Sequence, residues 1–149
     1  MDGDKKLVFE RIEHGSPAYE AMVELRQRVL RIPFGHPLTP EELAAESGDA
    51  HLVGYLDGAL AACLVLTDSG DGSVRMRQVA VDPALQGTGI GRGLVEFSER
   101  VAREIGVHEM RLHARDTAVG FYDRLGYSIE GEWFDEIDIP HIIMRKRLD

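Results

Sequence analysis

The stretch from Gln86 to Arg92 has the residue types best suited to chemistry. Gly87, Gly89 and Gly91 alternate there, after an apolar segment and ahead of an amphipathic one. Glycines let the backbone approach a ligand closely, and the first N–H groups of a helix lack internal partners, so together they form an anion site. Arg92 falls in the first turn, where the helix dipole disfavours a cation by about 0.3–1 kcal/mol, which makes sense if it meets a bound phosphate.

Two common phosphate-binding patterns do not fit this loop. The Walker A pattern ends in Gly-Lys-Ser/Thr, and the loop contains no lysine. The dinucleotide fingerprint requires glycine, one residue, glycine, two residues, glycine. Counted from Gly87 its last position falls on Arg92, and counted from Gly89 it falls on Leu94. The ligand is therefore expected to be a different phosphate compound.

The pattern that matches is Gln-x-x-Gly-x-Gly/Ala, filled by Gln86, Gly89 and Gly91 directly after the Val79–Pro83 strand end. It resembles motif A of the GNAT superfamily of N-acetyltransferases, in which loop amides hold the pyrophosphate of coenzyme A. Ala118–Tyr127 similarly resembles the superfamily's Ala-x-x-Phe-Tyr-x-x-x-Gly-Phe/Tyr segment. The resemblance spans at least Met76–Met144, and it implies acetyl transfer from acetyl-CoA, as co-substrate, to the amine of a small molecule or peptide.

The resemblance also assigns the residues that bind the co-substrate. The strands on either side of it are expected to splay, so that the backbone of Val79 and Val81 receives the pantetheine arm and the N–H of Val79 polarises the thioester carbonyl. The complete expected set is Val79, Ala80, Val81, Gln86, Gly87, Thr88, Gly89, Ile90, Gly91, Arg92 and Tyr122.

Tyr122 matches the family's general acid. Attack by an amine expels a thiolate, and a free tyrosine has a pKa of about 10, near that of an alkyl thiol, so proton transfer between them is well matched. The alternative is that Tyr122 is one more aromatic side chain packing its helix against the sheet.

The general base is less sharply indicated. Glu136 and His141, which flank the turn into the last strand, are the leading candidates, together with His113 on the strand before the Tyr122 helix. For each of them a surface or hydrogen-bonded role is the simpler reading, and a water relay without a dedicated base is an equal alternative. A non-catalytic sensor of coenzyme A would need the glycine loop but not Tyr122.

One position departs from the family pattern. Many members carry an asparagine three residues before the alanine of the Tyr122 helix, and here that position is Arg115. Arg115 is expected to contact the coenzyme or to shape the acceptor pocket. By family analogy the loop Arg31–Leu38 borders the acceptor cleft, but its residues do not choose between a small amine, an amino acid and a protein N-terminus. The net charge of −9 mildly favours a cationic acceptor.

Apolar periodicity predicts the elements that position these residues. The expected fold is a mixed, mostly antiparallel α/β sheet of about seven strands flanked by about four helices, with helices on both faces and one parallel crossover. Glu99 and Arg103 are expected to pair on the solvent side of the long helix. Strands are expected at 7–13, 51–56, 59–67, 74–81, 109–114, 127–133 and 137–146, and helices at 17–33, from 40, at 89–105 and at 117–125.

Composition narrows the function classes. The length of 149 residues favours a single domain, 1–149, and the acidic balance argues against nucleic acid. Cys63 lies within an apolar strand and is expected to be an inert thiol. The histidine and cysteine spacing predicts no metal site. The polar start, Met1–Lys6, and the short apolar runs predict a cytoplasmic protein without a membrane segment, and the paired C-terminal strands suggest a homodimer.

Overall fold

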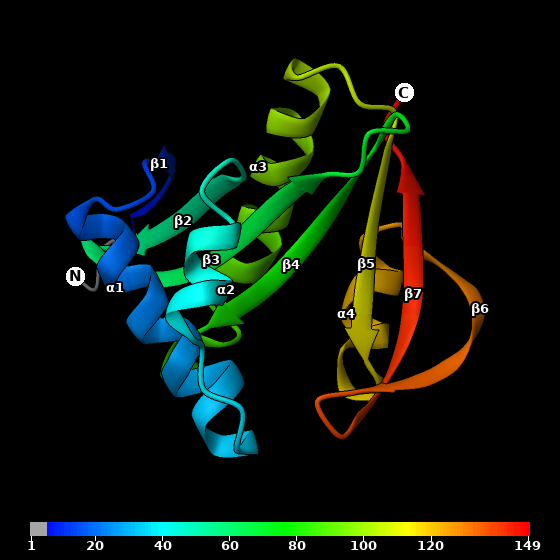
Figure 1. Ribbon diagram of the computed structural model, residues 1–149. Helices are drawn as coiled ribbons and strands as arrows, with labels where there is room; N and C mark the ends of the chain where they lie inside the picture. The colour runs from blue at the N-terminus through cyan, green and yellow to red at the C-terminus, as the bar shows by residue number, and fades with distance from the viewer. Residues whose placement is uncertain (1–5) are drawn as a thin grey trace.

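The segments with alternating apolar residues form one seven-stranded sheet in the computed structural model, which describes residues 6–149 (Figure 1). The strand order is β1-β2-β3-β4-β5-β7-β6, and only the β4–β5 pair is parallel. The predicted mixed sheet is thereby confirmed; residues 1–5, part of the start expected to lack a signal sequence, lie outside the described range. The strands are β1 (Leu7–Ile12), β2 (Ala50–Leu56), β3 (Ala59–Asp68), β4 (Ser73–Val81), β5 (Glu109–Arg115), β6 (Ser128–Glu136) and β7 (Ile139–Arg147).

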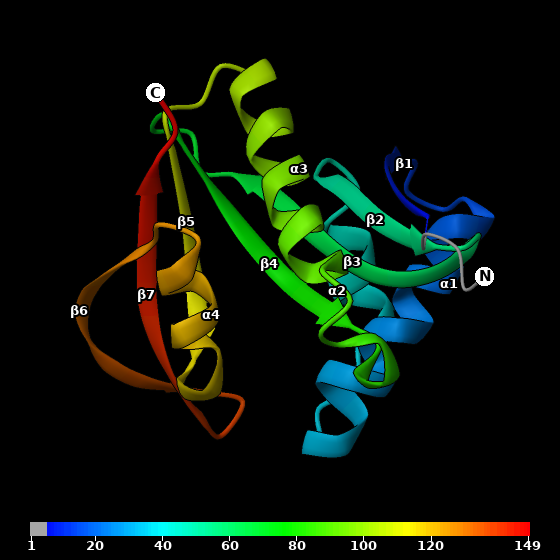
Figure 2. The same cartoon turned by 180° about the vertical axis from the view of Figure 1, so that it is seen from behind.

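Four α-helices cover the two faces of this sheet. The first two, α1 (Pro17–Arg26) and α2 (Pro40–Ala45), lie on one face, and α3 (Ile90–Glu104) and α4 (Val119–Arg124) lie on the other (Figures 1 and 2). The side chain of Ser16 accepts a hydrogen bond from the Tyr19 N–H, so the predicted cap of α1 is confirmed. The predicted order of strands and helices is also confirmed.

The helices pack against the sheet through two apolar cores, one on each face. The larger lies beneath α3 and α4, and the smaller beneath α1. Gly93 lets α3 approach β1 closely, because an added Cβ would lie 2.5 Å from the Phe9 ring. Ile105 is 47 % exposed, since α3 ends at Glu104, one residue before the predicted boundary, and Ile105 lies in its C-terminal cap. None of the helices within residues 6–149 is long and apolar enough to cross a bilayer.

The expectation that Glu99 pairs with Arg103 in solvent is wrong. Glu99 is buried and accepts hydrogen bonds from the Tyr127 hydroxyl at 2.9 Å and from Lys146 Nζ at 3.0 Å. Arg103 instead donates to the carbonyl of Leu148. Helical spacing alone placed Glu99 with the charged residues, whereas strands β6 and β7 bring polar partners over this side of the helix.

Two connections depart from the predicted boundaries. The first helix continues as a π-helix, Gln27–Arg31, and a short 3-10 turn, Ile32–Phe34, which contains Pro33 and ends at Gly35 with φ 78°. The last strand does not begin at residue 137, because Ile137 and Asp138 form the β6–β7 turn with φ values of 46° and 62°. A branched side chain in this left-handed region is strained, and the hairpin register imposes it.

Candidate active site

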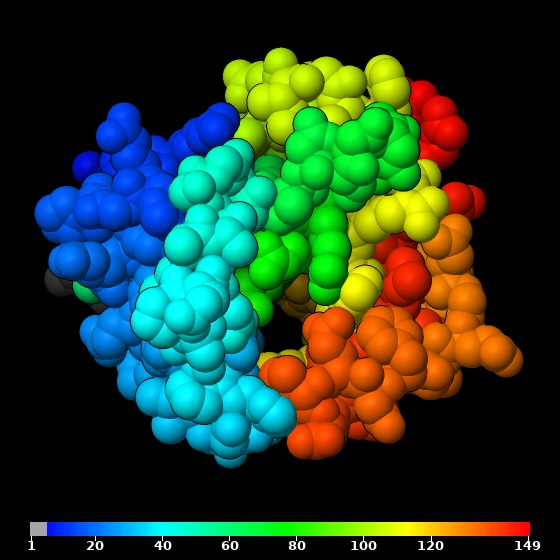
Figure 3. Space-filling model, viewed as in Figure 1, coloured from blue at the N-terminus to red at the C-terminus, as the bar shows by residue number. Residues whose placement is uncertain are grey.

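The cavity that collects most of the predicted residues opens where two neighbouring strands separate. Strands β4 and β5 pair only from Ser73 to Met76 against Glu109 to Leu112, and the rest of each strand is unpaired along this edge. The splay expected from the family resemblance is thus confirmed. A cavity of about 920 Å³ fills the gap and reaches the α1–α2 connection, the glycine loop, α4 and the β6–β7 turn. Figure 3 shows its mouth as a dark opening between these segments.

The glycine loop forms one wall of the cavity. Gly89 is the N-cap of α3 with φ 88°, and Gly87 has φ 86°. Because the N-cap has no side chain, the first N–H groups of α3 remain available to a ligand. An added Cβ at either glycine would meet nothing within 4 Å, so the space above them is open. This arrangement fits a diphosphate.

The residues of this loop differ in what they offer the cavity. Gln86, Gly87, Gly89, Gly91 and Arg92 line it. Thr88 and Ile90 do not: the Thr88 hydroxyl donates to the Leu85 carbonyl at 2.7 Å, and the Ile90 side chain is buried in the larger core. The Thr88 N–H also donates to the Leu85 carbonyl, so the co-substrate role expected of these two residues stays a prediction. Arg92 is largely exposed and lies 3.3 Å from Glu96.

A bulge in β4 exposes backbone groups on the opposite wall. The register against β3 jumps between Cys63 and Val65, and Gln78 takes φ 54°. Val79 consequently has no register partner on β3 or β5. Val79, Ala80 and Val81 all line the cavity, although the Ala80 side chain is buried in the smaller core.

Tyr122 lies on the cavity wall from α4 and is 6 % exposed. Its ring packs edge-on against Phe121 and Tyr127. Burial raises the pKa of Tyr122 well above its usual value, so the hydroxyl is protonated at neutral pH. Both the packing role and the proton-donor role considered for Tyr122 are compatible with this position.

The three candidate bases come together from three strands. His113 Nδ1 lies 2.8 Å from Glu136 Oε1, and His141 Nε2 lies 3.8 Å from Glu136 Oε2. The hydrogen bond with His113 holds the pKa of Glu136 below its usual value against the opposing effect of burial, so Glu136 is a carboxylate at neutral pH. All three residues line the cavity.

A fourth residue, Arg75, belongs to the same cluster. Its Nη2 lies 2.9 Å from His113 Nδ1 and 3.7 Å from Glu136 Oε1. His113 Nδ1 can accept a hydrogen bond from Arg75 when it carries no proton, or donate one to Glu136 when it is protonated, but it cannot do both at once. Nδ1 therefore has a partner in either state. Sequence reasoning missed Arg75, although its alternation with the buried Val74 and Met76 would have placed it on this face.

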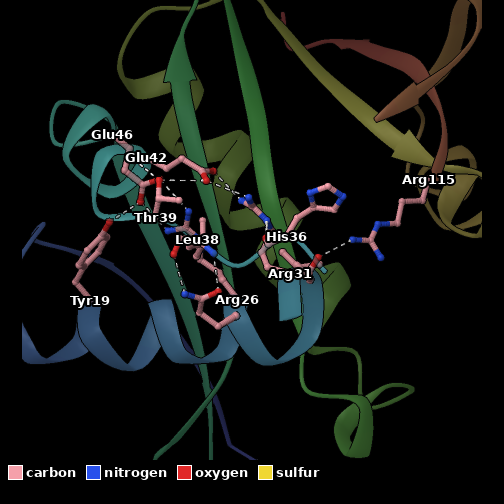
Figure 4. Close-up of polar contacts among 11 residues, drawn as sticks. Tyr19, Arg26, Arg31, His36, Leu38, Thr39, Glu42, Glu46 and Arg115 are labelled. Carbon is pink, nitrogen blue, oxygen red and sulfur yellow. Dashed lines mark hydrogen bonds and ion pairs between the residues drawn. The ribbon is translucent and has the colours of Figure 1, made fainter. Parts of the chain in front are cut away.

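The α1–α2 connection closes the cavity on the side away from α3. Arg31 pairs with Glu42 at 2.8 Å and donates to the carbonyl of His36 (Figure 4). His36 Nε2 in turn lies 3.2 Å from Asp138 of the β6–β7 turn. The loop Arg31–Leu38 therefore borders the cavity through Arg31 and contacts the opposite rim through His36.

Arg115 reaches across the cavity from β5 toward this connection, as Figure 4 shows. Its Nη2 donates to the Leu30 carbonyl at 3.3 Å, and its guanidinium lies 4.6 Å from the centroid of the Phe34 ring. Other lining residues that sequence reasoning did not single out are Glu42, Arg77, Gln78 and Arg124. They come from separate elements, and no shared motif marks them.

The remaining candidate groups lie elsewhere or are inert. Cys63 is fully buried, and burial raises the pKa of its thiol to about 12. Such a thiol is protonated at neutral pH, which matches the expectation of an unreactive side chain. Within residues 6–149, no three histidine, cysteine or acidic side chains are grouped as metal ligands.

Comparison with known proteins gives a consistent result. The model of the acetyltransferase (GNAT) family matches residues 19–127. A Bacillus subtilis (strain 168) protein provisionally named an acetyltransferase is 28% identical over 132 residues, which cover 85% of this chain and 87% of that protein.

Solved structures agree with the match in sequence. An acyl-CoA N-acyltransferase from Pseudomonas aeruginosa is 27% identical with a TM-score of 0.79, covering 95% of this chain and 99% of that one. Escherichia coli ElaA shares the fold at 22% identity, with a TM-score of 0.80 and the same coverage of the two chains, 95% and 99%. The family model spans most of the sequence and the fold agrees over nearly all of it, so this chain belongs to the GNAT family of acetyltransferases.

Proposed function

We propose that this protein moves an acetyl group from acetyl-CoA to a primary amine by direct attack within a ternary complex. Membership of the family supports acyl transfer from an acyl-CoA; the acetyl group, the amine nitrogen and direct attack are the proposal. The observation that carries it is a single cavity with the glycine loop on one side and, on the other, the Glu136 cluster. This cluster consists of Arg75, His113, Glu136 and His141. Donor and acceptor can then meet between β4 and β5.

The co-substrate would be held by main-chain groups. The N–H groups at the start of α3 face the open space above Gly87 and Gly89, where a diphosphate fits. Arg92 and Gln86 line the same wall. The backbone of Val79, which has no register partner, and that of Val81, which is paired with Ala62 of β3 but has no partner on β5, would receive the pantetheine arm as an added strand. Acetyl-CoA would supply the activated thioester.

Tyr122 would act as the general acid. Its hydroxyl is protonated at neutral pH because burial raises its pKa. A protonated phenol on the cavity wall is a suitable donor to the sulfur of the departing thiolate.

The proton lost by the attacking amine would pass to the Glu136 cluster. Glu136 carries the negative charge that attracts an ammonium group, and its depressed pKa makes it a weak base by itself. His113, at 2.8 Å, is the better proton acceptor, with Glu136 orienting and stabilising its charged form. His141 donates from Nδ1 to the Ile139 carbonyl, which leaves Nε2 directed toward Glu136 as a second acceptor.

A panel of primary amines with acetyl-CoA, followed by thiol release and by mass spectrometry of the acceptor, tests the proposal. The expected result is thiol release that depends on one class of amine and yields an acceptor heavier by one acetyl group. Calorimetric binding of acetyl-CoA without turnover of any amine would favour the sensor instead. No heat with millimolar acetyl-CoA at several temperatures would remove both functions.

A further inference from the structure

The charge of the cavity is opposite to that of the whole chain. The chain carries a net charge of −9. Among the residues that line the cavity, however, the only carboxylates are Glu42 and Glu136, no lysine is present, and six arginines are present: Arg31, Arg75, Arg77, Arg92, Arg115 and Arg124. Arg92 belongs to the glycine-loop wall and is accounted for by the phosphates of the donor.

Most of the other guanidinium groups already have protein partners. Arg31 uses both of its terminal nitrogens on Glu42. Arg77 donates to the Thr67 hydroxyl at 3.2 Å and lies 3.6 Å from Asp49. A guanidinium group with such partners is held in place, and few of its N–H groups remain free to bind a ligand.

Arg124, on α4 and so on the same face of the sheet as α3, has no ion pair among residues 6–149. Arg115 also differs from the paired arginines, because no carboxylate of residues 6–149 lies within ion-pair distance of it. It makes one hydrogen bond, to the Leu30 carbonyl, and stacks over Phe34. Both contacts come from the α1–α2 connection, which lies on the face of the sheet opposite α3 and α4. Arg115 is therefore aimed at the acceptor side of the cavity and away from the glycine loop.

The charged form of Arg115 is destabilised by its partial burial. Burial lowers the pKa of Arg115, and the Glu136 carboxylate offsets only part of that effect. A guanidinium that is half-buried without an anion gains strongly when an anionic ligand arrives, because charge-assisted bonds in a partly desolvated site are stronger than in water.

We infer that Arg115 binds an anionic group, a carboxylate or a phosphate, carried by the acceptor amine. The inference rests on the proposed function and deepens it by naming the acceptor class. An amine at one end would lie by the carboxylate of Glu136, and the anionic group at the other end by Arg115. This adds an anionic group to the cationic acceptor that the net charge mildly favours, because the local charge of the cavity acts on the acceptor at closer range than the total.

Matched acceptor pairs test this directly. Initial rates with acetyl-CoA are measured for amino acids against their α-amides and for phosphoethanolamine against ethanolamine. The wild-type protein is expected to favour the anionic member of the carboxylate pairs or of the phosphate pair by about 10- to 100-fold in kcat/KM, the range for losing one charge-assisted hydrogen bond. The pair with the larger ratio identifies the anion.

Arg115→Gln should abolish this preference by raising the KM for the anionic acceptor while leaving the KM for acetyl-CoA within about threefold, since no donor contact is lost. Phe34→Leu removes the stacking partner but keeps the charge, so it should retain the ratio even if turnover falls. Arg147→Gln, a largely exposed arginine paired with Asp149, serves as the matched control.

The outcomes separate the inference from the function on which it rests. Equal rates within each pair, or a faster amide, would overturn the role of Arg115 and leave acetyl transfer standing. A ratio unchanged in Arg115→Gln would do the same. An increased KM for acetyl-CoA with an unchanged acceptor ratio would place Arg115 on the donor. Binding of acetyl-CoA with no turnover of any amine would remove both proposals together.

Discussion

Tyr122 is buried against two aromatic rings, and no neighbouring charge stabilises its ionised form. Its hydroxyl is therefore a proton donor at neutral pH. The Tyr122→Phe variant keeps the packing and removes only the donor. If the hydroxyl protonates the leaving thiolate, kcat should fall by about 10²–10⁴-fold in a thiol-release assay while acetyl-CoA affinity is retained. Tyr55→Phe, on β2 and outside the cavity lining, is the control. Turnover within a factor of two of wild type would leave Tyr122 as a packing residue.

Glu136 and His113 should control the pH dependence of acceptor use. With a working base, kcat/KM for the amine levels off once the base is deprotonated, because the protein itself removes the proton of the ammonium form. In a Glu136→Gln/His113→Asn double variant, His141 also loses the carboxylate that would stabilise its charged form, so only the free amine reacts with this variant. Its kcat/KM should therefore climb by about tenfold per pH unit from pH 6 to 9, toward the pKa of the amine.

The control for this pair is Glu130→Gln, which lies on the same strand, contacts Arg111 outside the cavity, and should behave as wild type. Parallel profiles in the double variant and the wild type would assign proton removal to water. A loss of activity without a change in profile would assign the two residues to positioning.

At the scale of elements, the α1–α2 connection is held by a buried ion pair. Arg26 at the end of α1 donates to Glu46 in the C-terminal cap of α2 at 2.6 and 2.8 Å, and the Tyr19 hydroxyl donates to the same carboxylate (Figure 4). Both members of the pair are almost completely buried. The pair fixes the segment that carries Arg31 and Phe34 over the cavity.

Glu46→Gln should lower the free energy of unfolding by about 3–5 kcal/mol, because it leaves the Arg26 guanidinium buried without its counter-charge. Denaturant titration measures this. The double variant Arg26→Met/Glu46→Leu should recover much of the loss, since it removes both charges. Equal losses in the single and double variants would assign the effect to packing.

The same pair predicts an acid limit. Burial alone would raise the pKa of Glu46, but the bonds from Arg26 and Tyr19 outweigh it and the pKa is lowered. The folded-state pKa is below the unfolded value of about 4.3, so the contribution is fully present above that pH and is lost as pH falls through the folded pKa. Unfolding curves between pH 7 and 3 should show wild type losing its advantage over Glu46→Gln at the acid end.

At the scale of the whole molecule, the proposed binding of acetyl-CoA would join the two halves of the splayed sheet. A ligand at 100 times its dissociation constant adds about 2.7 kcal/mol to the free energy of unfolding. For a chain of this size each kcal/mol shifts Tm by about 2–4 °C, so a rise of about 5–10 °C is expected. A Gly89→Ala variant, strained at φ 88°, should show a smaller rise. An unchanged Tm in wild type at saturating ligand would contradict the proposed co-substrate.

The homodimer suggested by the C-terminal strands stays a prediction. Strand β6 is the last strand of the sheet, and its Ile129 and Trp133 are each about half exposed. Light scattering of the purified protein would determine the oligomeric state.

Local patterns in the sequence were sufficient for the order of elements and for the glycine loop at the start of α3, which lines the cavity. The glycines from Gly87 to Gly91 and the spacing along α3 are features of consecutive residues, and a turn or a helix is set by its own backbone and side chains. Residues such as Thr88 and Ile90 could be placed in the loop this way, although which of their groups faces the ligand could not.

Only the tertiary structure decided how the acceptor side is built. His113, Glu136 and His141 meet because β7 inserts between β5 and β6, and strand order depends on long-range pairing that no local pattern encodes. Long-range contacts also decide the position of Glu99, which is buried against Tyr127 and Lys146 and not exposed to solvent as expected. The net charge of the chain counts all residues equally, whereas the arginines that line the cavity act on a bound acceptor at close range.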